Sequence, residues 1–183
     1  MRHCRRAEDK FFSRDMLLAE IEPLRAQGWR LVFTNGCFDL LHAGHVYYLE
    51  HARALGDALI VAVNSDEGVR RLKGPGRPLV PAAERARVVA ALECVDYVTL
   101  FDEPDPSSVI ALLRPHIHVK GGDYKADALP EAATVRSYGG QVVIVPMLPG
   151  HSTSALVQRL REPNESDYPD REAISPGSAG TPE

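Results

Sequence analysis

The chain has 183 residues, of which 44% are hydrophobic and 25% charged, and its formal net charge is −4 at pH 7. These values are typical of a single globular domain with a full hydrophobic core, so two independent domains are not expected. No apolar run is long enough to span a bilayer, and no apolar secretory segment follows the basic N-terminus. We therefore predict a cytoplasmic protein without a membrane partner. Three widely spaced cysteines (Cys4, Cys37 and Cys94) indicate reduced thiols, not disulfides or a zinc site.

The negative charge lies at the C-terminal end. Residues 162–183 contain six acidic residues and one arginine, a net charge of −5, which leaves about +1 for the other 161 residues. That body has no long basic run, so no nucleic-acid partner is expected. Residues 162–183 are also rich in Pro, Ser and Gly, and we predict a disordered acidic tail. We divide the chain into an N-terminal extension (1–12), one domain (13–161) and this tail.

Helical and extended hydrophobic patterns alternate along the domain. Ser13 is a predicted cap for a helix whose apolar residues recur at helical spacing as far as Gly28. Further helices are predicted at 44–55, 81–92, 106–113, 129–138 and 152–160, and strands at 30–34, 58–63, 96–101, 117–119 and 141–145. This alternation predicts an α/β fold, a five-stranded parallel sheet with helices on both faces. Ligands of such sheets bind at the carboxyl ends of the strands.

Polar and glycine residues follow the first predicted strand. The segment from Thr34 to His45 includes Gly36, which permits close backbone approach, and leads into a helix near Gly44. A helix start presents free N–H groups and the positive end of the helix dipole. His42 and His45 are three residues apart, so both can face one bound anion. The pattern favours phosphate binding over a metal pair or two surface histidines.

Three later segments follow other predicted strands. Residues 70–78 form a basic loop rich in Gly and Pro, which either covers the pocket or is an ordinary solvated loop. Residues 120–124 place a lysine before two glycines, which suits contact with an anion or a plain turn. The hydroxyl residues at 152–154 either cap the last helix or add donors for phosphates.

Several common nucleotide sites and catalytic sites are excluded. The chain lacks GxGxxG, which argues against a dinucleotide-binding site, and it lacks GxxxxGK[ST], so it is not a P-loop protein. No serine elbow or Cys/His pair suggests covalent catalysis.

Together, the segments 34–45, 119–124 and 152–154 resemble the cytidylyltransferase-like nucleotidyltransferase superfamily. Within it, the resemblance is to heptose 1-phosphate adenylyltransferases, and it covers the chain from Ser13 to Leu160. It implies a Rossmann-like, HIGH-type nucleotidyltransferase fold. It also implies transfer of AMP from ATP to D-glycero-D-manno-heptose 1-phosphate, giving pyrophosphate and ADP-heptose, a lipopolysaccharide precursor. Mg²⁺ on the NTP phosphates is the implied cofactor, with no metal ligand from the protein. No kinase-like sugar domain precedes the domain, so we expect a separate protein to carry out the kinase step.

The resemblance also implies roles for individual residues. His42, His45 and Lys73 are the predicted catalytic residues, and Arg85 is expected near the β- and γ-phosphates. The predicted nucleotide-binding residues are Thr34, Asn35, Gly36, Cys37, Gly44, Arg85, Lys120, Gly121, Ser152, Thr153 and Ser154. The predicted substrate-binding residues are Phe38, Asp39, Asn64, Gly122 and Asp123. For Asp39, a structural cap of its own turn is an equal alternative.

Three questions stay open at this point. The nucleotide is expected to be ATP, with GTP or CTP as alternatives. The alternative functions are a cytidylyltransferase acting on glycerol 3-phosphate or another phospho-alcohol, and a nucleotide-binding module without catalysis. A homodimer is expected, because dimers are common among similar enzymes.

Overall fold

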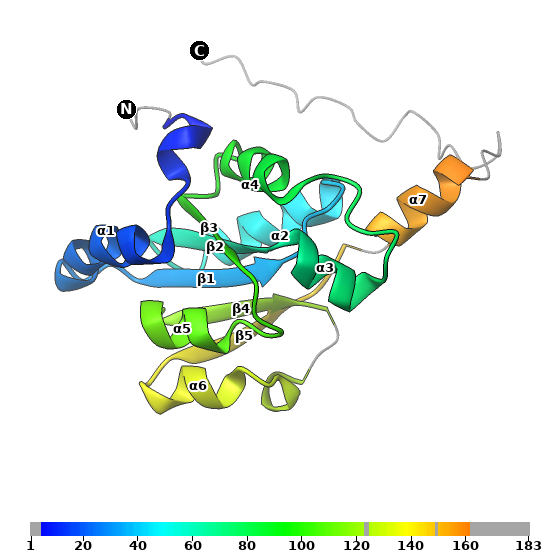
Figure 1. The fold of residues 1–183 in the computed structure, drawn as a ribbon. Helices are drawn as coiled ribbons and strands as arrows, with labels where there is room; N and C mark the ends of the chain where they lie inside the picture. Colours follow the sequence, from blue (N-terminus) through cyan, green and yellow to red (C-terminus); the bar gives the residue numbers. More distant parts are fainter. Residues whose placement is uncertain (1–4, 123–124, 149, 162–183) are drawn as a thin grey trace, which may run out of the picture.

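The computed structural model describes residues 5–122, 125–148 and 150–161. Five parallel strands form one sheet in the order β3-β2-β1-β4-β5. The predicted α/β fold is confirmed (Figure 1). The strands are β1 (Leu31–Gly36), β2 (Ala58–Asn64), β3 (Tyr97–Phe101), β4 (Ile117–Gly121) and β5 (Gln141–Val145). The helices are α1 (Arg14–Ala26), α2 (Ala43–Arg53), α3 (Asp66–Lys73), α4 (Ala82–Ala90), α5 (Ser107–Leu113), α6 (Ala132–Ser137) and α7 (Thr153–Arg161), with short 3₁₀ turns η1 (Ala7–Lys10) and η2 (Ala126–Ala128).

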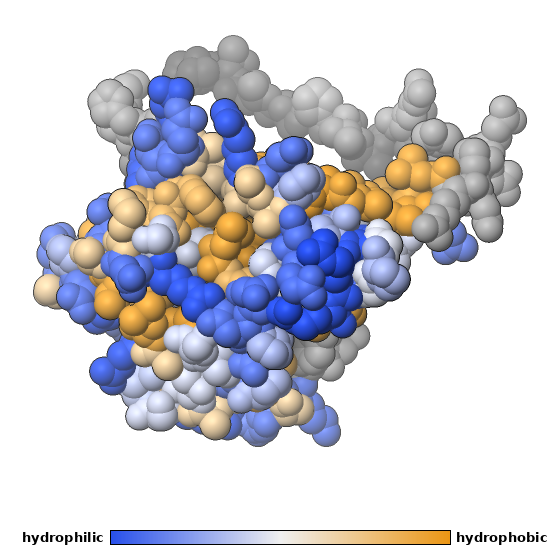
Figure 2. Space-filling model, viewed as in Figure 1, coloured by the Kyte–Doolittle hydropathy of each residue, from blue (hydrophilic) through white to orange (hydrophobic). Residues whose placement is uncertain are grey.

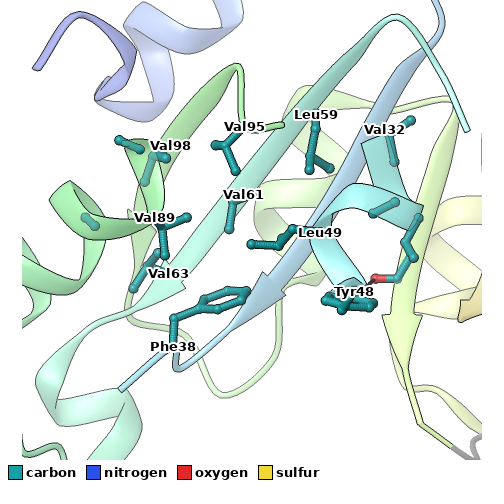
Figure 3. Close-up of a cluster of buried hydrophobic side chains, with 14 of the residues drawn as sticks. Val32, Phe38, Tyr48, Leu49, Leu59, Val61, Val63, Val89, Val95 and Val98 are labelled. Atoms are coloured by element: carbon teal, nitrogen blue, oxygen red, sulfur yellow. Dashed lines mark hydrogen bonds between the residues drawn. The ribbon is translucent and has the colours of Figure 1, made fainter. Parts of the chain in front are cut away.

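Helices cover both faces of the sheet because successive strand residues point to opposite sides. Every residue of β2 is buried, as its continuous apolar run predicts. Leu59, Val61 and Val63 pack with α2 and α4 in one core cluster (Figure 3), whereas Ala58, Ile60 and Ala62 pack with α1, α5 and α6 in the other. The sheet is thus covered on both faces, so ligand-binding residues are expected only at the ends of the strands.

The strand order sets the place of a ligand site. From β1 the chain moves to β2 and β3 on one side, and it then returns to β4 and β5 on the other. The order therefore reverses between β1 and β4, where loops leave the sheet in opposite directions and open a crevice at the carboxyl ends.

One predicted element needs correction. Arg70 to Lys73 were predicted to belong to a loop, but they form the second half of helix α3. The Ser65 hydroxyl accepts a hydrogen bond from the N–H of Gly68, which caps the helix, and acidic and basic residues lie at the ends that suit the helix dipole. The helix is short and only Gly68 and Val69 are buried in it, so its hydrophobic period is too weak to recognise.

The described part of the predicted N-terminal extension packs on the domain. Phe11 forms a parallel bridge with Val98 of β3, and the N–H of Phe12 donates to the Val98 carbonyl at 2.9 Å. Lys10 is buried and donates to the Leu92 carbonyl at 3.0 Å. The predicted acidic tail lies outside the described residues.

Candidate active site

A cavity of about 350 Å³ lies at the carboxyl ends of β1 and β4, at the predicted crevice. Its walls come from the loop after β1, the start of α2, the end of α3, the end of β4 and the start of α7. The structure therefore brings together most of the predicted site. The lining residues are Asn35, Gly36, Cys37, Phe38, Asp39, His42, His45, Tyr48, Lys73, Arg77, Lys120, Gly121, Met147, His151, Ser152, Thr153 and Ser154.

His42 and His45 lie together at the start of α2. His42 is the N-cap residue, but its side chain makes no capping hydrogen bond. The two imidazoles stack with ring centroids 3.9 Å apart and an interplanar angle of 27°. Both Nδ1 atoms are buried without a hydrogen-bond partner among the described residues. A buried polar atom without a partner is costly, and both histidines also line the cavity.

The surroundings keep both histidines neutral in the free protein. Burial, with a smaller effect of the neighbouring His42, lowers the pKa of His45 to about 4. Burial and the nearby His151 also lower the pKa of His42. A bound anion would reverse these effects, because negative charge next to an imidazole favours its protonated form. Binding of a polyphosphate is therefore coupled to the charge of this pair.

Glycines occupy two crowded positions of the site, Gly44 in the first turn of α2 and Gly121 at the end of β4. A Cβ atom on Gly44 would lie 3.0 Å from the His42 ring and 3.0 Å from the Cβ of His151. A Cβ on Gly121 would lie 2.6 Å from the Met147 sulfur and 3.1 Å from the Tyr48 ring. Side chains at these positions would crowd the walls of the cavity.

Two lysines face the cavity in different ways. Lys73, at the end of α3, is exposed and forms no ion pair or hydrogen bond with another described residue. Figure 2 shows the strongly hydrophilic surface over α3. Lys120 instead donates to the Asn35 side chain at 3.0 Å and to Glu131 at 3.3 Å. Lys73 is therefore free to move toward a ligand, whereas Lys120 and Asn35 form a fixed part of the wall.

Glu131 supports this wall from inside the fold. It is buried, and its carboxylate also lies 3.0 Å from Nε2 of the buried His118. Burial alone would raise the pKa of Glu131, but the hydrogen bond with His118 and the charge of Lys120 lower it to about 2. The carboxylate is therefore ionised and holds the lysine in place.

Asp39 forms a buried hydrogen-bond network with the loop before α4. Its carboxylate is almost fully buried and accepts hydrogen bonds from Arg77 at 2.5 Å and from the N–H groups of Leu79 and Val80 at 2.8 and 2.9 Å. Burial would raise the pKa of Asp39, but these hydrogen bonds and the charge of Arg77 lower it. Asp39 thus ties the loop before α4 to the loop after β1. Its partners lie in a distant loop and not in its own turn, and its predicted role in substrate binding stays a prediction.

Arg85 occupies a different place from the one expected. Its side chain is fully buried and does not line the cavity. The guanidinium donates to the carbonyls of Cys37, Asn64 (2.8 Å) and Val80 (2.8 Å), and it pairs with Asp66 at 2.7 Å. With these donors committed, Arg85 joins the residue after β1, the end of β2 and the start of α3 beneath the site, and its expected contact with phosphates stays a prediction.

Thr34 and Asn64 are also set back from the cavity. The Thr34 hydroxyl is buried and bonded to the Tyr48 hydroxyl at 2.6 Å, which donates to the Val119 carbonyl at 2.9 Å. The Asn64 side chain is buried and accepts from the Cys37 thiol at 3.8 Å. Burial is the main cause that raises the pKa of Cys37. These residues position the strand ends that meet at the crevice.

Phe38 and the start of α7 complete the cavity. Phe38 packs into the core below the site (Figure 3). Its ring lies 5.3 Å from that of His45. Ser152 caps α7, since its hydroxyl accepts from the N–H of Ala155 at 3.1 Å. The side chains of Thr153 and Ser154 line the cavity. Gly122 adopts a φ of 119° and does not line the cavity, and the predicted Asp123 lies outside the described residues.

Sequence reasoning missed Tyr48, Glu131 and Met147. Tyr48 follows His45 by three residues, so helical spacing places it on the same face of α2 and would have indicated it. Glu131 and Met147 carry no such local signal, because they reach the site only through the packing of α6 and the turn after β5.

The described residues contain no group of three or more His, Cys, Asp or Glu side chains that could hold a metal ion. Over the same part of the chain, no helix has the length and apolar character needed to cross a membrane.

Comparison with known proteins identifies relatives of this fold and sequence. The bifunctional protein HldE of Pelobacter propionicus is 51% identical over 156 residues, and that of Trichlorobacter lovleyi is 50% identical over 158 residues. These alignments cover 85% and 86% of the chain but 32% of each relative, so the chain spans about a third of their length.

Two solved structures are similar in fold to this chain. A lipopolysaccharide core biosynthesis protein from Thermoplasma volcanium is 31% identical with a TM-score of 0.55, and the match covers 66% of this chain and 98% of that protein. Pantothenate synthetase from Thermus thermophilus, at 19% identity and a TM-score of 0.51 over 76% of this chain and 62% of that one, shares the fold alone. The family model described as cytidylyltransferase-like matches residues 33–162. The chain, with its paired histidines at the β1–α2 junction, belongs to the cytidylyltransferase-like family.

Proposed function

We propose that this protein is a nucleotidyltransferase that moves AMP from ATP to D-glycero-D-manno-heptose 1-phosphate, releasing pyrophosphate and forming ADP-heptose. The observation that carries the proposal is the stacked pair His42 and His45, which lines the cavity at the start of α2 and whose buried Nδ1 atoms have no partner among the described residues. About 50% identity to two HldE proteins supports the sugar-phosphate branch over other members of the family.

The acceptor needs no general base. The second pKa of a phosphate monoester is about 6, so the sugar phosphate is already a nucleophile at neutral pH. One of its oxygens attacks the α-phosphorus in line, and a new P–O–P bond forms. The bond from the α-phosphorus to the oxygen that bridges to the β-phosphate breaks, and its electron pair leaves with pyrophosphate. The protein's task is therefore to bring two anions together and to stabilise the charge that moves.

The residues around the cavity suit that task. His42 and His45 would donate to the triphosphate at the start of α2, where backbone N–H groups also point at the ligand. Lys73 would approach the reacting phosphate from the end of α3, and the start of α7 would add the hydroxyls of Thr153 and Ser154. Lys120 is fixed by Asn35 and Glu131, so it would contribute positive charge without moving.

Mg²⁺ is part of the proposal as a companion of the nucleotide. Because the described residues form no cluster of metal ligands, the triphosphate oxygens would hold the ion, and its charge would help to neutralise them. The predicted homodimer and cytoplasmic location stay predictions; light scattering of the purified protein would measure the oligomeric state.

The test is a coupled assay of pyrophosphate release with ATP, GTP and CTP, each combined with heptose 1-phosphate or glycerol 3-phosphate, with products identified by mass spectrometry. ATP with heptose 1-phosphate should give ADP-heptose. Release only with CTP and glycerol 3-phosphate would favour the cytidylyltransferase alternative, and no release with any pair would favour a binding module.

Two variants on α2 test the assignment of His45. His45→Ala should lower turnover by about 10²-fold or more, the usual cost of losing one preorganised donor to the transition state. His51→Ala is the matched control, because His51 lies on the same helix but is exposed and contacts only the Tyr47 ring and carbonyl. Wild-type turnover in His45→Ala would refute the assignment.

A further inference from the structure

A second cavity, of about 500 Å³, lies at the amino ends of the strands, where β1, β4 and β5 begin. It is formed by the end of α1, the segment between α5 and β4, and the turn between α6 and β5. The first cavity lies at the carboxyl ends of β1 and β4, and these strands are six and five residues long. At ~3.3 Å per residue, the two cavities are therefore about 17 Å apart. The second cavity is therefore distinct from the candidate active site.

Three arginines from separate segments line this cavity. Arg25 donates to the carbonyls of Leu113 and Arg114, Arg30 donates to the Gln141 side chain at 3.3 Å, and the Arg114 guanidinium lies 5.3 Å from the centre of the Tyr138 ring. Within the described part of the chain, none of the three forms an ion pair with a carboxylate.

Two other arginines of the fold form ion pairs with carboxylates. Arg14 pairs with Glu103 at 2.5 Å, and Arg53 pairs with Asp96 at 2.8 Å. The second cavity thus gathers arginine side chains that the described carboxylates do not balance, and its local charge is positive.

Two other polar side chains of this cavity, those of His116 and Tyr138, carry N–H or O–H groups. Nδ1 of His116 accepts a hydrogen bond from the N–H of Leu31 at 3.0 Å, so the neutral ring carries its proton on Nε2. Burial first, and then the charges of Arg25 and Arg30, lower the pKa of His116. The Tyr138 hydroxyl is buried and has no hydrogen-bond partner among the described residues, and burial raises its pKa to about 12.

Two backbone positions around the second cavity are unusual, Arg114 in its conformation and Gly140 in its close contacts. Arg114 ends α5 with φ 44° and ψ 57°, a left-handed conformation that glycine adopts at lower cost. This conformation directs the chain toward Pro115 while the guanidinium lies over the Tyr138 ring. On the other side, a Cβ atom on Gly140 would lie 2.8 Å from the Tyr138 ring and 2.9 Å from the Val135 carbonyl.

We propose that this second cavity is a binding site for a phosphorylated small molecule, held by Arg25, Arg30 and Arg114. Three guanidinium groups and two neutral donors exceed what one carboxylate can accept, whereas a phosphate monoester carries up to two charges and three strong acceptor oxygens. The volume lies in the range of small-molecule sites.

The test follows His116 by NMR in the whole chain, with its resonance assigned through His116→Gln. Inorganic phosphate, pyrophosphate, ATP and acetate are titrated at constant ionic strength. A phosphate near Arg25 and Arg30 offsets their charge, so the pKa of His116 should rise, and the most effective probe indicates whether a single phosphate or a polyphosphate is the preferred source. An effect of acetate equal to that of phosphate, or no effect of any probe, would overturn the proposal.

Two variants and a control test whether phosphate binds in the second cavity. Arg30→Gln and Arg114→Gly should each weaken phosphate binding about tenfold, the effect of losing one charge-assisted hydrogen bond. Glycine at 114 suits the left-handed backbone, so this variant removes the guanidinium without straining the fold. Arg87→Gln, an exposed arginine on α4, makes the same change of charge and should bind phosphate normally.

The candidate active site also holds phosphates in the proposed function, so His45→Ala separates the two cavities. The His116 response should persist unchanged in this variant. Its loss would show that the response comes from the first cavity, and it would overturn the second site without touching the proposed reaction.

Discussion

Replacing Arg85 distinguishes a structural arginine from a phosphate ligand. In Arg85→Ala, the carbonyls of Cys37, Asn64 and Val80 lose their donor and the Asp66 carboxylate loses its partner. A lost hydrogen bond at a buried group costs about 1–3 kcal/mol, and these costs do not add fully. Removing one partner of a buried charged network costs about 3–5 kcal/mol in total. We expect that loss in the free energy of unfolding, and a melting temperature lower by roughly 10 °C.

The assay is urea unfolding followed by circular dichroism, with the Michaelis constant for ATP measured in parallel. Arg87→Ala is the control, since it removes an arginine from the same helix whose side chain is 75% exposed. Its free energy of unfolding should change by less than about 0.5 kcal/mol. If Arg85→Ala unfolds like the wild type but has a much higher Michaelis constant for ATP, Arg85 contacts phosphate and the supporting role is refuted.

Three other predictions concern the site and its wall. Gly44→Ala places a methyl group 3.0 Å from the His42 ring, so kcat/KM for ATP should fall while the melting temperature changes little. In the free protein, the NMR titration of His45 should give a pKa of about 4 that rises when ATP binds; a free value near 6.5 would contradict the burial described. The pKa of Glu131 is lowered to about 2, so its contribution to stability is present above about pH 4.5 and is lost as the pH falls toward 2, and Glu131→Gln should flatten that part of the stability profile.

The sheet could be predicted from sequence because each strand is a short apolar run bounded by turn residues. Residues 58–63 show this most clearly, and β2 is buried throughout. Helix α3 could not be predicted by hydrophobic period, because its face toward the core is only Gly68 and Val69. Its signals were the Ser65 cap and the distribution of charge along the helix, which are weaker than burial.

At the site, sequence reasoning found the residues that surround the cavity but could not separate ligands from supports. The cavity is lined by His42, His45, Lys73 and the hydroxyl residues at 152–154, whose roles stay predictions. Arg85 has the residue type and position of a phosphate contact. Its guanidinium, however, donates hydrogen bonds to backbone carbonyls that only the folded chain brings together. Charge and spacing indicate what a side chain is capable of, whereas its hydrogen-bond partners decide what it is free to do.

The pairing of Phe11 and Phe12 with β3 has a practical consequence. β3 is the outermost strand on its side of the sheet, and an outer strand with unpaired amides is a template for intermolecular strand addition. Residues 11–12 occupy part of that outer rim, and Arg5 packs over the rings of Phe12 and Tyr97. Shortening the protein to begin at Ser13 would leave the candidate active site complete but expose apolar side chains along this rim. Such a protein should aggregate at concentrations that the longer chain tolerates.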